Sequence, residues 1–225
     1  MRSRSVVSPA WTALVFAGTV LVGPSAHAQG GAGWSIEVLT GAAHNFALDL
    51  TVRQSGLEEL SLTGRFETRP FEDAPYYAVR LARWGDRSGW ELELLHHKLY
   101  LSEPTPEVER FDVSHGFNVV SLIRTWRVGG WAIRTGGGIV VAHPETVVRG
   151  RASPGTGGLF GRGYFVTGPA AQLGAGRRLR LGGGLFLGAE GAFTAARAHV
   201  PVVDGEASVP NVAVHVRVGL GWSRE

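Results

Sequence analysis

The fold of this chain is best predicted from residues 75–101, which read PYYAVRLARWGDRSGWELELLHHKLYL. The Gly, Asp and Ser residues between Trp84 and Trp90 are typical of a tight turn, so the stretch predicts two strands joined as a hairpin. After Trp90 the second strand alternates Glu-Leu-Glu-Leu, which gives it one charged face and one apolar face. Tyr76 and Tyr100 lie near the two ends of the whole stretch. These features indicate a strand of a transmembrane β-barrel, with lipid outside and a polar lumen.

Length and composition support a single β domain. The chain has 225 residues, enough for one barrel or sandwich. It has no Cys, which excludes disulfide frameworks, thiolate metal sites and Cys nucleophiles. Although 44% of the residues are hydrophobic, no apolar run beyond residue 28 reaches the roughly 18 residues that a membrane-spanning helix needs. Any membrane insertion is therefore expected to use strands.

The first 28 residues predict a secretory signal peptide. Arg2 and Arg4 form a basic start, residues 10–23 an apolar core and residues 26–28 (Ala-His-Ala) a cleavage site. The alternative, an N-terminal membrane anchor, is disfavoured because the core is short. Without the two arginines, 20 basic residues face 19 acidic ones and the net charge falls from +3 to +1, so nucleic acid is not expected as a partner. The mature domain is predicted to be residues 29–225.

The rest of the chain predicts an all-β, up-and-down antiparallel transmembrane β-barrel of ten strands. Each segment has about the length that a tilted barrel strand needs, although the first two are short. If those two form one distorted element, an eight-stranded barrel is favoured instead. The predicted strands are 34–41, 46–54, 57–68, 75–84, 89–100, 115–127, 130–142, 163–176, 183–199 and 210–222.

The predicted connections alternate in length, as they do between the periplasmic turns and the outer loops of bacterial barrels. Both chain ends of the mature protein would then be periplasmic. The short connections are 54–56, 85–88, 128–129 and 177–182, and the long ones are 101–114, 143–162 and 200–209.

The aromatic residues sort by strand end in this topology, with Trp at the short turns and Tyr at the long loops. Two girdles at the membrane interfaces would give this pattern, because amphipathic rings favour the headgroup level. The alternative is that the rings plug the ends of a lipocalin-like barrel. The predicted girdle residues are Trp34, Trp84, Trp90, Trp126, Trp131, Trp222, Tyr76, Tyr77, Tyr100 and Tyr164.

The face opposite the apolar one carries charges of both signs, and these are expected to line the lumen. Buried charges must pair or meet water, because an isolated one costs several kcal/mol. The favoured interpretation is a structural ion-pair network, and the alternative is a narrow polar pore. The predicted lumen residues are Glu59, Arg65, Glu67, Arg80, Glu91, Glu93, Arg134, Glu190, His215 and Arg217.

These features together resemble the small outer-membrane β-barrels of Gram-negative bacteria, over residues 34–222. The last predicted strand ends in Val-Gly-Leu-Gly-Trp at 218–222, which looks like the C-terminal assembly signal of such barrels, although three residues follow it here. The resemblance implies a location in the bacterial outer membrane. It also implies outer-membrane lipids, lipopolysaccharide and the barrel-assembly machinery as partners.

One group of residues near the 101–114 loop has the composition of a catalytic site. If His97 and His115 both point inward, they lie close to Asp112 and Ser114 at the rim, as in Ser-His-acid sites. Ser114 and His115 are neighbours, however, and would point to opposite faces of a strand. Outer-membrane lipid A deacylases carry a His-x-Ser motif that is absent here, so no site is transferred from that family.

A simpler role for the rim is binding of lipopolysaccharide phosphates by His96, Lys98 and Arg110. A metal site is not expected, because neighbouring histidines on a strand point apart, and no cofactor is expected either. Three hypotheses remain. The leading one is a non-enzymatic outer-membrane barrel that supports the envelope or passes small molecules; the others are a lipid-modifying deacylase or acyltransferase and a soluble periplasmic lipocalin-like carrier.

Overall fold

The computed structural model describes residues 32–72, 74–153 and 155–224, so the predicted signal peptide at 1–28 lies outside the described residues. Among the described residues, no helix is long and apolar enough to span a membrane. The secondary structure consists of β-strands, and nearly all of the pairings are antiparallel.

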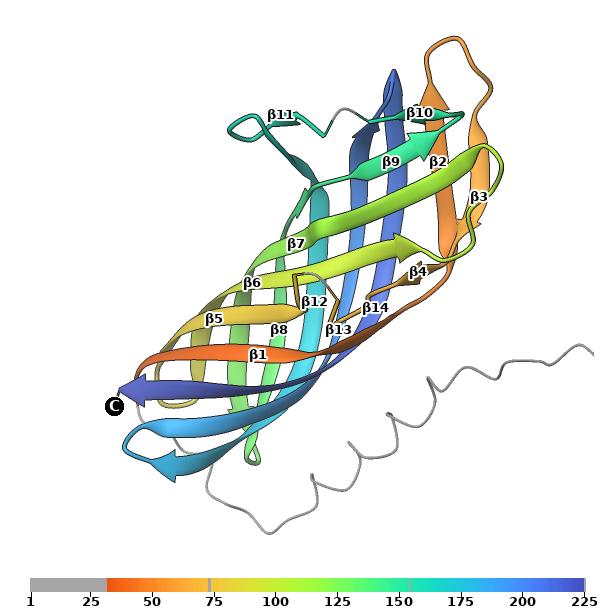
Figure 1. Cartoon of the computed structure of the whole chain (residues 1–225). Coiled ribbons are helices and arrows are strands. Elements are labelled where there is room, and N and C mark those ends of the chain that lie inside the picture. Colours follow the sequence, from red (N-terminus) through yellow and green to blue (C-terminus); the bar gives the residue numbers. More distant parts are fainter. Residues whose placement is uncertain (1–31, 73, 154, 225) are drawn as a thin grey trace, which may run out of the picture.

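Eight strands close into a ring in which every strand is antiparallel to both neighbours (Figure 1). The ring closes because β1 pairs with the last strand on one side and with β5 on the other. Each ring strand follows its predecessor in the chain or is separated from it only by short extra strands. The members, in ring order, are β1 (Gly33–Asn45), β5 (Tyr77–Trp84), β6 (Ser88–Leu101), β7 (Val108–Val128), β8 (Trp131–Ala142), β12 (Arg162–Gly182), β13 (Leu185–Val202) and β14 (Gly205–Arg224).

The predicted count of ten strands is therefore wrong, and the alternative count of eight is the one found. The predicted strands 46–54 and 57–68 leave the ring and form a hairpin of β2 (Leu48–Gln54) and β3 (Leu60–Gly64). Since β1 pairs directly with β5, no place remains for them in the wall. Instead β2 pairs with the first residues of β14, which extends beyond the ring.

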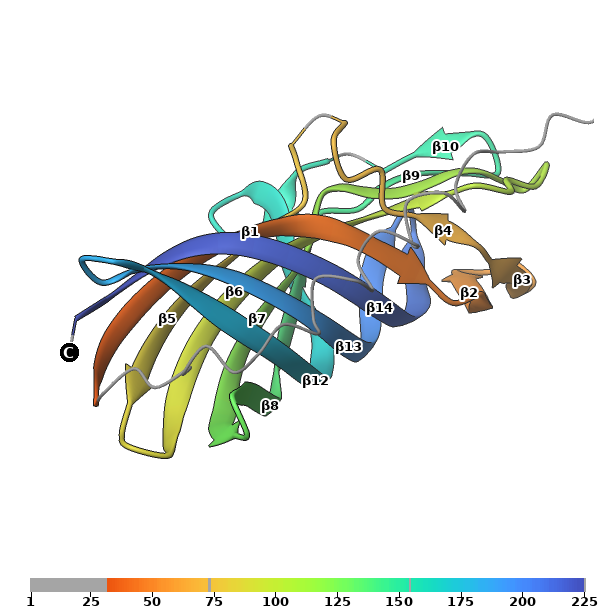
Figure 2. The same ribbon diagram turned by 90° about the horizontal axis from the view of Figure 1, so that it is seen from below.

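The short turns after β5, β7 and β12 lie at the end of the barrel where the C-terminus lies (Figures 1 and 2). At the other end β13 and β14 continue as a hairpin whose pairing reaches Val202 and Gly205. The predicted long loop 200–209 is thus mostly strand. The predicted short turn 54–56 also lies at this far end, with Ser55 N donating to Asp204 O at 2.9 Å, and not among the turns near the C-terminus.

Several short strands complete a sheet that projects past the ring at this far end (Figure 1). β9 pairs with the first residues of β7, and β4 pairs with the last residues of β6. We refer to β2, β3, β9, β10 and the adjoining ends of β7, β13 and β14 as the extension. The short strands here are β4 (Phe66–Glu67), β9 (Glu145–Val148), β10 (Arg151–Ala152) and β11 (Gly157–Gly158).

The outer wall of the ring is apolar. Along β14 the outward residues from Val212 to Trp222 are all apolar, and Val218 and Leu220 are more than half exposed. Ten steps of about 3.4 Å, at a strand tilt of about 40°, span about 26 Å, which matches the apolar band of outer-membrane barrels. Other exposed apolar residues of the wall are Ile36, Val38, Leu81, Leu92, Leu122, Ile133, Ile139, Leu173, Leu187, Phe193, Val214 and Val216.

The lumen is filled by side chains. At its far end lies an apolar layer that includes Leu95, Leu99, Phe111 and Phe117, all at most 1% exposed. Below it, glycines on the inner face of the wall make room for long charged side chains. A Cβ on Gly188 would lie 2.0 Å from Oε1 of Glu37, so a side chain at this position would require the carboxylate to shift.

The aromatic girdles differ from the prediction at three residues. Trp84 and Tyr76 have the same parity in the chain as Arg80, so both point into the lumen and are buried. Tyr100 is covered by the segment around Arg69, whose guanidinium carbon lies 4.6 Å from the ring centre. By contrast Trp34, Trp90, Trp126 and Trp222 are exposed on the outer wall near the short turns.

Candidate functional site

The central feature of the lumen is Arg80, which contacts four carboxylates from three other strands. Its Nη2 lies 2.8 Å from Oε1 of Glu190, and its Nη1 lies 3.1 Å from Oε2 of the same residue. Nη1 also donates to Glu37 at 3.2 Å, and Nε donates to Glu93 at 3.0 Å. Glu91 lies 3.3 Å from Nε. All five side chains are at most 3% exposed, so the group has little access to water.

Three further arginines complete the group, which we call the lumen network. Arg134 donates to Glu91 at 2.8 Å and contacts Glu190 at 3.0 Å. Arg217 contacts Glu190 at 2.6 Å and donates to Glu93 at 3.1 Å, and Arg178 donates to Glu37 at 3.0 Å. The lumen network thus has four arginines and four glutamates, and each charge is compensated. Its members are Glu37, Arg80, Glu91, Glu93, Arg134, Arg178, Glu190 and Arg217.

Three predicted lumen residues lie elsewhere. Glu59 and Arg65 flank β3, Glu67 lies in β4, and all three are exposed and pair with other exposed residues. Their predicted place in the lumen depends on 57–68 being a wall strand, whereas this segment leaves the ring. Glu37 and Arg178, in contrast, were missed.

A polar layer lies between the lumen network and the apolar layer. His215 contacts the hydroxyl of Tyr76 through Nδ1 and Oγ1 of Thr194 through Nε2, each at 2.9 Å. His97 Nε2 lies 2.9 Å from Oδ1 of Asn45. The rings of His97 and His215 have their centres 5.3 Å apart. The structure therefore places His97 in the lumen with His215 and not at the rim with His115.

His115 points outward because β7 carries a bulge next to it. His97 pairs with Phe117 and Leu99 with Val113, so β7 has two more residues than β6 over this interval. Gly116, within the bulge, has a φ of 123°, a conformation that favours glycine. The alternation is interrupted only within the bulge, because Val113 before it and Phe117 after it are both buried, whereas the side chain of His115 is 63% exposed.

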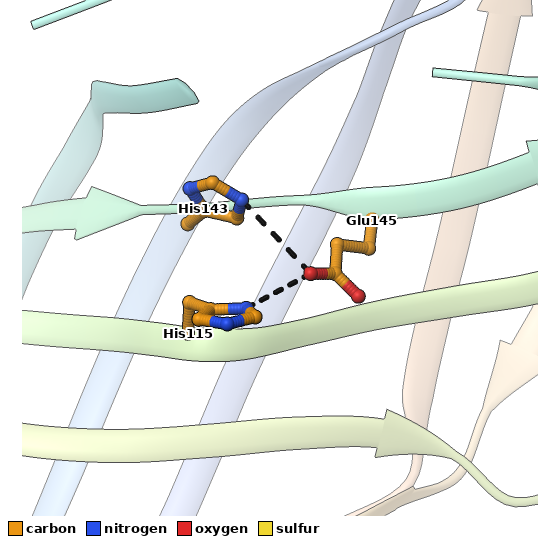
Figure 3. Close-up of side chains that lie close together, drawn as sticks. All are labelled: His115, His143 and Glu145. Carbon is orange, nitrogen blue, oxygen red and sulfur yellow. Dashed lines mark ion pairs between the residues drawn. The ribbon is translucent and has the colours of Figure 1, made fainter. Parts of the chain in front are cut away.

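The bulge brings together a cluster that the sequence analysis did not predict (Figure 3). After β8 ends, His143 N donates to Gly116 O at 3.1 Å, and β9 then pairs with β7 from Glu145 onward. His115 Nδ1 lies 2.8 Å from Oε1 of Glu145, and His143 Nε2 lies 4.0 Å from the same oxygen. One ligand atom from each of the three residues lies within 4.8 Å of the others. We call His115, His143 and Glu145 the rim triad.

The surroundings of the rim triad fix its carboxylate and one of its rings. Arg110 Nη2 lies 2.5 Å from Oε2 of Glu145, so Arg110 holds one oxygen and leaves Oε1 facing the histidines. The ring of Tyr164 packs edge-on against His143, with centres 4.9 Å apart. Burial, together with the neighbouring His115, lowers the pKa of His143 against the opposing effect of Glu145. This shift favours the neutral form of the His143 ring.

The predicted catalytic group does not have the geometry of a Ser-His-acid site. Ser114 Oγ lies 3.2 Å from Nδ1 of His115, the same nitrogen that contacts Glu145. In a working site the nucleophile and the acid contact opposite ring nitrogens, so that the ring can take a proton from one side while the other orients it. Asp112 accepts from Arg110 at 2.7 Å and is not the partner of either histidine.

The predicted lipopolysaccharide contacts are also placed differently. His96 and Lys98 are at most 5% exposed, because β4, Glu72 and Tyr77 pack against this part of β6. Lys98 Nζ donates to Glu72 O, and the ring of His96 stacks on Tyr77 with centres 4.9 Å apart. Arg110 is exposed, although Asp112 and Glu145 compensate its charge.

Comparisons with known proteins find similarity in structure only. No protein-family model matches the chain, and no curated protein matches it. Among solved structures, the outer membrane protein OprG from Pseudomonas aeruginosa aligns over 88% of this chain and 99% of its own, with a TM-score of 0.46 and 11% identity. The outer membrane protein AlkL, solved in DMPC bilayers, aligns over 88% and 92%, with a TM-score of 0.44 and 12% identity. The attachment invasion locus protein Ail of Yersinia pestis aligns over 86% and 99%, with a TM-score of 0.41 and 11% identity.

The resemblance to small outer-membrane barrels that the sequence indicated is thus also found in structure, at low identity. One of the residues that the prediction missed, Glu37, left a signal in the sequence. Glu37 alternates with Ile36 and Val38 in the first strand, as the lumen glutamates of β6 alternate with leucines. The rim triad left no such signal in the sequence, because its members come together only through the bulge in β7.

Proposed function

We propose that this chain is an outer-membrane β-barrel that acts as a closed anchor and holds the extension outside the cell. The observation that carries the proposal is the filled lumen. The lumen network compensates all of its own charges, and the polar and apolar layers cover it on the far side. Since small barrels are commonly filled by side chains, such a lumen suits a structural role better than solute passage.

The outer wall supports a location in a membrane. Its apolar band is about as tall as the hydrocarbon region that outer-membrane barrels span. At the short-turn edge of the band, Arg124 lies beside two tryptophans, with its guanidinium carbon 5.1 Å from the ring centre of Trp90 and 5.9 Å from that of Trp126. Aromatic rings with cations beside them fit the headgroup level, where phosphates are available.

The apolar outer wall also argues against a soluble carrier. A lipocalin-like barrel has an apolar cavity and a polar exterior, whereas this barrel has charges inside and apolar side chains outside. We infer that its partners are outer-membrane lipids, lipopolysaccharide at the extension side and the barrel-assembly machinery, which would engage the last strand. The short turns and both ends of the described chain would lie in the periplasm.

Two experiments test this function. Full-length protein expressed in a Gram-negative host is expected to sediment with the outer membrane, to resist extraction by carbonate and to run at different positions on a gel before and after heating. Extraction without detergent would exclude the membrane barrel. Folded protein in planar lipid bilayers is expected to give no conductance steps, and reproducible steps would favour the narrow-pore alternative.

A further inference from the structure

We propose that the rim triad, His115, His143 and Glu145, binds a divalent transition-metal ion, with Zn²⁺ as the best match. The three side chains come from the bulge of β7, from the β8–β9 connection and from the first residue of β9. They offer two imidazole nitrogens and one carboxylate oxygen, the donor set that Zn²⁺ uses in sites with three protein ligands. The site is independent of the closed lumen and adds a function to the extension side.

The distances fit such an ion after a small adjustment. A tetrahedral ion with bonds of about 2.1 Å holds its ligand atoms about 3.4 Å apart. The ligand atoms of the rim triad all lie within 4.8 Å of one another, so the widest gap must close by about 1.4 Å. His115 is the residue that can move, because its side chain is 63% exposed. His143 and Glu145 are at most a quarter exposed; Glu145 is held by the backbone pairing of β9 with β7, and His143 by its backbone bond to Gly116.

Both histidines face the same oxygen of Glu145, which is the arrangement that a shared cation would need (Figure 3). Arg110 occupies the other oxygen and thereby orients the carboxylate, as outer-shell donors do around metal sites. The positive charge of Arg110 is offset by Asp112 at 2.7 Å, so it opposes the entry of a cation only weakly.

The donor set also excludes the hard cations that are abundant at bacterial surfaces. Mg²⁺ and Ca²⁺ prefer six or more oxygen ligands, and the rim triad offers one carboxylate with two nitrogens. With three protein ligands, a fourth position on the metal stays open to water or to a donor from outside. A bound ion would link the first residue of β9 to the bulge of β7 and would thereby make the extension more rigid.

The test is titration of folded, untagged protein in detergent with Zn²⁺ after treatment with a chelator, followed by calorimetry. One equivalent is expected to bind, and Mg²⁺ in its place is expected to give no heat of binding. His115→Ala and Glu145→Gln are each expected to weaken Zn²⁺ binding by at least about tenfold, since loss of an outer-shell partner alone has an effect of about 10- to 100-fold. His115→Ala is the decisive variant, because its exposed side chain can be removed without disturbing the fold.

The matched control is His199→Ala. His199 Nδ1 lies 3.5 Å from Glu206 Oε1, so this pair offers one imidazole and one carboxylate without a second histidine. His199→Ala is expected to leave Zn²⁺ affinity unchanged. Equal weakening by His199→Ala and His115→Ala, or a wild type that binds no Zn²⁺ while its gel mobility still shifts on heating, would overturn the proposal.

Discussion

Arg80 of β5 and Glu190 of β13 form a two-point contact across the lumen, with Nη2 2.8 Å from Oε1 and Nη1 3.1 Å from Oε2. The two residues lie 110 positions apart in the chain. Their strands are separated in the ring by β14 and β1. The contact therefore exists only when the barrel has closed, and it ties opposite parts of the wall together. The same arginine compensates three other carboxylates, so the lumen network depends on it more than on any other member described.

Replacement of Arg80 by Met is expected to destabilise the barrel strongly. The change leaves four buried carboxylates facing three arginines, and an uncompensated buried charge costs about 3–5 kcal/mol. Urea unfolding in lipid vesicles, followed by Trp fluorescence, measures the difference. The control is Arg53→Met, which removes an exposed pair with Glu59 and is expected to cost less than about 1 kcal/mol. Equal effects of the two variants would show that the lumen is wet.

Gly188→Ala is expected to destabilise the barrel by about 1–3 kcal/mol, because the added methyl group meets Oε1 of Glu37 at 2.0 Å and must shift a carboxylate that Arg80 and Arg178 hold through Oε2. Gly191 lies three residues further along β13, and a Cβ there meets nothing within 4 Å. Gly191→Ala is therefore the control and is expected to be neutral. Unfolding midpoints in urea compare the two, and a neutral Gly188→Ala would contradict the packing described.

The inward direction of Trp84 gives a spectroscopic prediction. In variants that keep a single Trp, brominated lipid acyl chains are expected to quench Trp222 and Trp90 strongly and Trp84 weakly. The reason is that Trp222 and Trp90 lie on the outer wall, while Trp84 is 4% exposed and packs under the guanidinium of Arg127, 4.3 Å from its ring centre. Strong quenching of Trp84 would restore the girdle that the sequence predicted.

The topology can be tested with single cysteines, because the native chain has none. Ser55→Cys lies in the β2–β3 turn of the extension, and Arg87→Cys lies in the β5–β6 turn at the opposite end. A membrane-impermeant maleimide on intact cells is expected to label the first and to label the second only after the outer membrane is opened. The reverse result would invert the orientation.

The shared use of one ring nitrogen predicts no acyl-transfer chemistry at the rim. Ser114 and Glu145 both contact Nδ1 of His115. The ring therefore cannot accept a proton from Ser114 on one nitrogen while Glu145 orients it through the other. Mass spectra of lipid A from cells with and without the protein are expected to be identical. A gained or lost acyl chain that depends on both Ser114 and His115 would support the lipid-modifying alternative.

The two-residue alternation let the sequence predict which residues of the wall strands face inward. Glu91, Glu93, Arg134 and Arg217 follow from it directly, since a strand turns its side chains to opposite faces whatever its neighbours are. The short turns after β5 and β7 and the placement of Trp near them follow from local composition in the same way.

Alternation alone cannot decide which strands enter the ring, because that depends on which edges remain free to pair. Residues 46–68 have the strand pattern, yet β1 pairs with β5 and the free edge is offered by the projecting end of β14. The rim triad depends on closure for the same reason. A bulge in β7, set by its pairing with β6, turns His115 outward, and β9 then brings Glu145 beside it. The sequence by itself determined the two faces of each strand, and only the pairing of distant strands decided the ring of eight, the partners of Arg80 and the meeting of His115 with His143.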